Sequence, residues 1–166
     1  MTNRTQDFKA FETKAPRTNT FQPLNTYTLE LEHDPGRPKQ LFAGNDPWIT
    51  AIPQDSQPDH IQIGANLNSQ EWITLNIPIQ VIPENGTVES LPIVKLVDKP
   101  KDEKASTKGI SLHDGSRLRF STDFEGKLTI TRKGQDLTLS YSATGGGGFK
   151  LTNVEFRFID YQDPEK

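Results

Sequence analysis

The alternation of apolar and polar residues is strand-like from residue 26 onward. Tyr27, Leu29 and Leu31 alternate with threonine and glutamate across residues 26–32, the period-2 pattern of a half-buried β-strand. A turn rich in Pro and Gly at residues 33–38 ends this pattern. The pattern therefore predicts that the first strand has one buried and one solvated face.

Four further apolar runs, each bounded by Pro, Gly, Asp or Asn, predict strands in the first half of the chain. The longest run covers residues 72–82 and contains Pro78, which lacks an amide proton, so we expect a sheet edge or a bulge at that residue. The dipeptide Asn85-Gly86 follows and favours a tight hairpin into a strand over residues 88–97. The three shorter runs are Leu41–Ala43, Trp48–Ile52 and Ile61–Ala65.

The pattern in the second half of the chain predicts a meander of strands. After a lysine-rich loop at 98–109, alternating apolar residues mark strands around Leu118–Phe120, Leu128–Ile130, Leu137–Tyr141 and Leu151–Tyr161. A segment of ten residues with convincing helical periodicity is absent from the sequence. About nine or ten short strands separated by Gly and Pro predict an all-β protein, an antiparallel, jelly-roll-like β-sandwich.

The N-terminal residues differ in composition from this body. Residues 1–23 are rich in Thr, Asn, Gln and Lys and show no alternating pattern. We expect an extended polar arm here, whose aromatic residues Phe8, Phe11 and Phe21 contact a partner; a disordered tail is the alternative. The predicted organisation is thus an arm at 1–23, a β-sandwich domain at 24–161 and a C-terminal tail at 162–166.

Composition narrows the classes of function. The 166 residues fit one domain, and the absence of cysteine excludes disulfides, cysteine nucleophiles and thiolate metal sites. The sequence has neither a signal-peptide pattern nor an apolar stretch long enough for a membrane helix, so we expect a soluble protein, cytoplasmic or part of a virion or similar particle. A net charge of −3 argues against a nucleic-acid partner.

Charge and aromatic residues are unevenly distributed. Residues 40–94 contain no Lys or Arg, whereas residues 95–108 are lysine-rich. Such asymmetry steers partners or simply reflects separately solvated faces. The basic-free stretch also holds Trp48, Trp72 and many amides. These two tryptophans are candidate residues for a sugar site or a protein interface, and core packing is the competing interpretation.

Candidate chemistry is sparse. Each of the three histidines neighbours an aspartate, in the pairs His33-Asp34, Asp59-His60 and His113-Asp114. If two pairs met in space they would suit a metal or acid–base chemistry, but all three lie at predicted turns, where Asp bonds its own backbone. A pair of carboxylates for glycoside hydrolysis also remains an alternative, because such a pair needs no adjacency in the sequence. We expect the glycines at 145–148 to form a flexible hairpin connection, and we expect no catalytic residue, metal or cofactor.

The segment from Leu128 to Ser142, followed by glycines and Phe149, resembles the late strands of concanavalin-like jelly-roll domains. The resemblance covers under a quarter of the chain and implies a β-sandwich. The matching motif is the alternation of apolar and polar residues in strands together with glycines in turns. We assign no functional residue from the resemblance.

These observations favour a non-enzymatic structural or assembly protein that binds protein subunits and forms a homo-oligomer, of the phage or particle decoration, cement or tail-associated type. Its compact β body, polar arm and segregated charge motivate that expectation. The alternative is a carbohydrate-binding β-sandwich module with a Trp platform. A hydrolase with carboxylate or His/Asp chemistry ranks third.

Overall fold

Alternating apolar side chains produce strands along most of the chain. The computed structural model describes residues 25–32, 38–54, 57–69, 71–94, 107–114, 119–121, 124–145 and 148–164, and the predicted arm lies outside these ranges. Within them the elements are β1 (Thr26–Glu32), β2 (Gln40–Gly44), β3 (Trp48–Gln54), β4 (Gln57–Asn66), β5 (Glu71–Pro78), the 3-10 helix η1 (Ile79–Val81), β6 (Gly86–Val94), β7 (Thr107–Asp114), β8 (Arg119–Ser121), β9 (Glu125–Lys133), β10 (Asp136–Thr144) and β11 (Lys150–Phe158).

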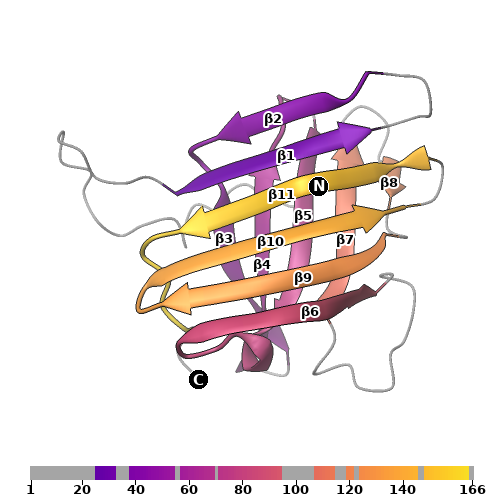
Figure 1. Ribbon diagram of the computed structural model, residues 1–166. Helices are drawn as coiled ribbons and strands as arrows, with labels where there is room; N and C mark the ends of the chain where they lie inside the picture. The colour runs from indigo at the N-terminus through magenta and orange to yellow at the C-terminus, as the bar shows by residue number, and fades with distance from the viewer. Residues whose placement is uncertain are drawn as a thin grey trace, which may run out of the picture.

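The strands form two layers that cross at a steep angle (Figure 1). The front sheet has the strand order β2-β1-β11-β10-β9-β6, and the back sheet has the order β7-β5-β4-β3, with β8 paired to β7. Neighbouring strands are antiparallel within both sheets. A short parallel contact of Ile93 and Val94 with Thr107 and Lys108 joins the sheets at one side. The predicted all-β sandwich is confirmed.

The core fills the space between the two inner faces. Leu139, Phe156 and Leu29 from the front sheet and Ile63 and Leu75 from the back sheet are almost fully buried. Burial of one such side chain contributes about 1.5–3 kcal/mol relative to leaving it in water. The Phe156 ring also stacks on neighbouring rings across the front sheet, with centroid distances of 6.1 Å to Tyr27, 6.5 Å to Tyr141 and 6.4 Å to Phe158.

Three predictions for the chain at and after Pro78 meet different outcomes. The strand ends at Pro78 and η1 follows, so the run over 72–82 is not one strand. Pairing between β5 and β7 ends at Asn76, so among the described strands Pro78 has a neighbour on the β4 side alone, as an edge position requires. The predicted Asn85-Gly86 hairpin is wrong: β6 pairs with β9 and not with β5, because the chain crosses to the front sheet after η1.

A central strand lies partly where the sequence predicted a loop. β7 pairs with β5 over six residues, from Glu71 with Asp114 to Asn76 with Lys108. The predicted glycine connection, in contrast, is a hairpin: Thr144 pairs with Lys150, and the Gly145 amide donates a hydrogen bond of 2.9 Å to the Phe149 carbonyl. Phe149 packs edge-on against Phe124, with ring centroids 6.3 Å apart.

The residues after β11 are held against the domain. The Tyr161 amide donates to the Gln135 carbonyl at 2.9 Å, and Arg132 lies 5.0 Å from the centroid of the Tyr161 ring. The same Arg132 bonds both carboxylate oxygens of Asp163, at 3.1 and 2.9 Å. Burial, followed by the adjacent charge of Asp163, raises the pKa of the Tyr161 phenol. Residues 161–163 therefore pack as part of the β domain.

Candidate functional site

Both tryptophans lie on the outer face of the back sheet. In the strand register Trp48 faces Gly64, and Gly64 faces Thr74. These residues alternate with the inward-facing Ile63 and Ala65, so they point away from the core. Trp48 is nevertheless only 5% exposed. Its ring covers Gly64 so closely that a Cβ atom there would lie 2.5 Å from two ring carbons.

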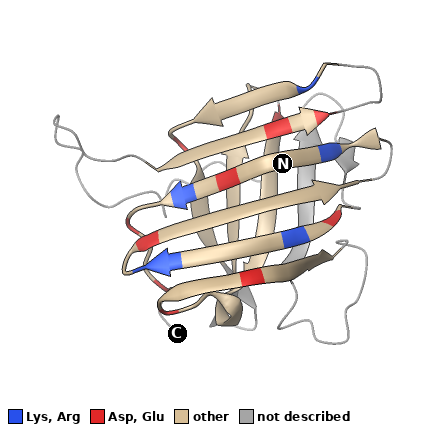
Figure 2. Ribbon diagram, viewed as in Figure 1, with Lys and Arg blue, Asp and Glu red and all other residues tan. Residues whose placement is uncertain are grey.

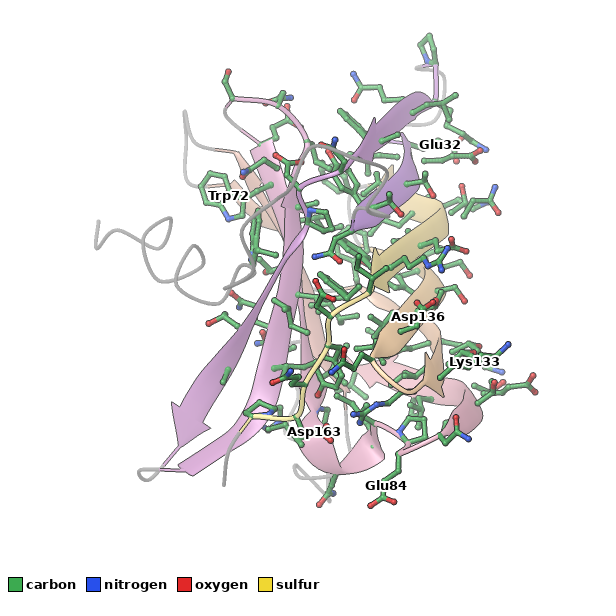
Figure 3. All side chains as sticks on the ribbon, turned by 90° about the vertical axis from the view of Figure 1, so that its left-hand side faces the viewer. Glu32, Trp72, Glu84, Lys133, Asp136 and Asp163 are labelled. Atoms are coloured by element: carbon green, nitrogen blue, oxygen red, sulfur yellow. The ribbon has the colours of Figure 1, made fainter. Side chains whose placement is uncertain are left out.

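Trp72 retains more accessible surface than Trp48. It is half-buried and pairs with Asn66 on β4 and with His113 on β7. Figure 3 shows its side chain on the side of the back sheet that faces away from the front sheet. Of the two predicted ligand or interface residues, Trp72 therefore offers the larger surface to a partner.

The amides of the basic-free stretch are dispersed, and two of them bond each other. Gln62 and Asn76 pair across β4 and β5 on the outer face. The side-chain amide nitrogen of Gln62 donates a hydrogen bond of 2.9 Å to the side-chain oxygen of Asn76. Asn68 instead orders the β4–β5 turn by accepting a bond of 2.8 Å from the Glu71 amide. Fewer amides are thus available to a sugar than the composition indicates.

Among the residues whose side chains the structure describes, most charged residues on strands belong to the front sheet. Figure 2 shows most blue and red segments on the front strands, whereas β3, β4 and β5 are largely tan where described. Glu30 on β1 accepts a hydrogen bond of 3.0 Å from the Lys39 ammonium and another of 2.9 Å from the Thr152 hydroxyl. These bonds lower the pKa of the Glu30 carboxyl, with that from Lys39 contributing most. The basic-free stretch of residues 40–94 supplies β3, β4 and β5 of the back sheet and also β2 and β6 of the front sheet.

Strand β2 forms an open edge of the front sheet. It ends the strand order and has β1 as its one neighbour within the described residues. Phe42 faces Leu29 and packs on the core, so the adjacent Leu41 and Ala43 point to the outer face. Leu41 is 73% exposed and is the large hydrophobic residue found exposed in the described part of the chain.

The exposure of Leu41 was missed because the run Leu41–Ala43 reads as uniformly apolar. A signal was present in the sequence: adjacent residues of a strand point to opposite faces, so Leu41 and Phe42 cannot share one buried face. Since the flanking strand β1 has one solvated face, one of these two residues has to lie on that face.

The two histidines within the described residues lie far apart. His60 pairs with Pro78 and His113 pairs with Trp72, so six residues of β5 separate them, about 20 Å at the rise of a strand. His33 lies outside the described residues, as do Phe8, Phe11 and Phe21. Within the described residues there is no group of three or more His, Asp or Glu placed to hold a metal ion. The described residues also contain no helix of the length and hydrophobicity that crossing a membrane requires.

Comparisons with known proteins add no relative to this description. No protein-family model, no curated protein and no solved structure matches this chain. The functional argument therefore rests on the geometry of the described residues.

Proposed function

We propose that this chain is a non-enzymatic structural protein that acts by binding other protein subunits, as decoration, cement or tail-associated components of phages and similar particles do. The observation that carries the proposal is the edge strand β2 with the 73% exposed Leu41. Unpaired backbone at a sheet edge and an exposed large apolar side chain are both features that a protein partner covers.

The proposal assigns contacts to two parts of the chain. Strand β2 supplies the edge, and the polar arm supplies Phe8, Phe11 and Phe21 as apolar anchors. The described part of the front sheet carries many charges and the described part of β3, β4 and β5 carries few, and this difference favours one orientation of a partner over others.

The role of the arm is tested by deletion of residues 1–22. The β domain should keep its far-UV circular dichroism spectrum, because the core described by the structure is formed by residues from Tyr27 onward. Assembly that depends on the arm should be lost, which light scattering detects as a smaller particle mass. An unchanged mass distribution would contradict this role.

The alternative function is carbohydrate binding at Trp72, which the half-buried ring on the outer face of the back sheet favours. Aromatic rings stack on sugar C–H faces, and Asn66 lies beside Trp72 in the register. Glycan-array screening of the full chain and of a Trp72→Ala variant tests it. Binding that Trp72→Ala removes would support a sugar site, and an array without any bound glycan would count against it.

A further inference from the structure

The open strand edges of this protein differ in how they are protected. Strand β6 lacks a β7 partner before Ile93, but there it bulges between Val88 and Leu91, with Ser90 in the left-handed region at a φ of 58°. Strand β3, at the end of the back sheet, contains Pro53. Bulges and prolines of this kind prevent a sheet edge from pairing with another chain.

Strand β2 has none of these protections. Its five residues, Gln40–Gly44, contain no proline and no charged residue. It pairs with β1 in one unbroken register from Tyr27 with Gly44 to Leu31 with Gln40, so its backbone is regular. Its outer face carries the exposed Leu41 beside Ala43. This edge is therefore built to accept another strand.

We propose that β2 pairs antiparallel with β2 of a second copy of this chain, around a two-fold axis that passes by Phe42. The two front sheets then become one continuous sheet across the dimer. This inference rests on the proposed function and names the partner of the β2 edge. A two-fold interface brings the same patch of both copies together, so it requires a strand that is complementary to itself.

The residues of β2 meet that requirement in the register centred on Phe42. Leu41 of each copy then faces Ala43 of the other, so the exposed apolar side chain meets an apolar neighbour twice. Phe42 faces Phe42 beside the core, and Gln40 faces Gly44. A register centred on Leu41 or on Ala43 would instead place Lys39 opposite Ala43 or Leu41 opposite Asn45.

Charge at the two ends of the strand permits the same register. Lys39 lies on the outer face, where its ammonium bonds Glu30 at 3.0 Å. In the Phe42-centred pairing Lys39 faces the uncharged Asn45 of the second copy, so like charges do not meet there. The two-fold axis repeats this pairing at the other end. Pro38 and Pro47 flank the strand and limit the pairing to it.

The first test uses the absence of cysteine from this chain. Full-length Leu41→Cys and Ala43→Cys proteins that carry different mass tags are mixed, mildly oxidised and separated without reductant. Facing positions on antiparallel strands lie within the range that a disulfide bridges. Mixed 41–43 disulfides should exceed each same-site disulfide at least tenfold. Thr28→Cys is the control, because Thr28 is on the same outer face one strand further in, opposite Ala43.

The second test uses charge pairing. Leu41→Lys combined with Ala43→Lys places like charges opposite each other and should raise the dissociation constant of the dimer at least tenfold. Leu41→Lys combined with Ala43→Glu places opposite charges there and should retain the dimer. Both double variants introduce charge at exposed positions, so both should keep the circular dichroism spectrum of the unmodified chain.

The outcomes separate this inference from the proposed function. Mixed disulfides together with a charge-dependent dimer support the pairing. Same-site disulfides, or an oligomer that both double variants leave unchanged, would overturn the pairing while leaving an assembly function in place. An unmodified chain that never associates with itself or with another protein would overturn both.

Discussion

The Tyr27 hydroxyl on β1 donates a hydrogen bond of 2.6 Å to the backbone carbonyl oxygen of Asn66 at the end of β4. This bond ties the front sheet to the back sheet at the end where the chain passes from β2 to β3. A second core tyrosine, Tyr141 on β10, differs in this respect, because its buried hydroxyl has no hydrogen-bond partner among the described residues.

Tyr27→Phe should lower the free energy of unfolding by about 1 kcal/mol, the net contribution of a typical intramolecular hydrogen bond. The ring and its stacking on Phe156 are retained, so the change isolates the hydroxyl. Urea denaturation followed by circular dichroism measures it. A Tyr27→Phe protein as stable as the unmodified chain would show that this bond does not hold the sheets together.

Tyr141→Phe should have the opposite sign and raise the free energy of unfolding by about 1 kcal/mol. Its hydroxyl loses water on folding without gaining a partner, and that cost disappears with the oxygen atom. The same burial raises the pKa of the Tyr141 phenol. Because both variants remove one hydroxyl from a core tyrosine, each is the control for the other, and a loss of stability in Tyr141→Phe would contradict this account.

Gly64→Ala should destabilise the back sheet by about 2–3 kcal/mol, the cost of overpacking a close contact. The new Cβ atom would lie 2.5 Å from the Trp48 ring and 2.7 Å from the Ile73 carbonyl oxygen, and the backbone of a central strand cannot yield easily. Gly134→Ala is the control. No atom lies within 4 Å of its new Cβ, so its cost is about 1 kcal/mol, from a φ of 61° alone. Equal losses in the two variants would refute the close packing of Trp48.

Lys39→Met should raise the pKa of Glu30 towards its usual value of 4.5, because the ammonium bond is the main cause of the lowered pKa. A carboxyl whose folded pKa is lowered stabilises the fold above its unfolded pKa, and the effect is lost as the pH falls through the folded pKa. The stability difference between the variant and the unmodified chain should therefore shrink below pH 4.5. NMR titration of the Glu30 carboxyl carbon measures the shift, and Lys133→Met on β9 should leave it unchanged.

The sequence predicted those elements whose pattern is local. Tyr27, Leu29 and Leu31 alternate with polar residues, and β1 has that alternation of buried and exposed positions. The hairpins from β9 to β11 were predictable for the same reason, since glycine turns separate short alternating runs. In these segments the strand period and the turn chemistry agree, and tertiary contacts do not override them.

The predictions that failed depend on contacts between distant residues. Asn85-Gly86 suits a hairpin locally, yet β6 pairs with β9, about forty residues further along the chain. The chain at Ile110 and Leu112 alternates with polar residues, but the neighbouring lysines concealed the strand that completes the back sheet. The edge position of β2 follows from the strand order and not from any local pattern.

The mass of the full-length chain in solution, measured by light scattering across a range of concentrations, tests the central claim most directly. The account predicts that the weight-average mass rises with concentration from 18.6 kDa to at least twice that value, as β2 edges pair. A mass that stays at 18.6 kDa at every concentration would contradict it and would favour the carbohydrate-binding alternative at Trp72.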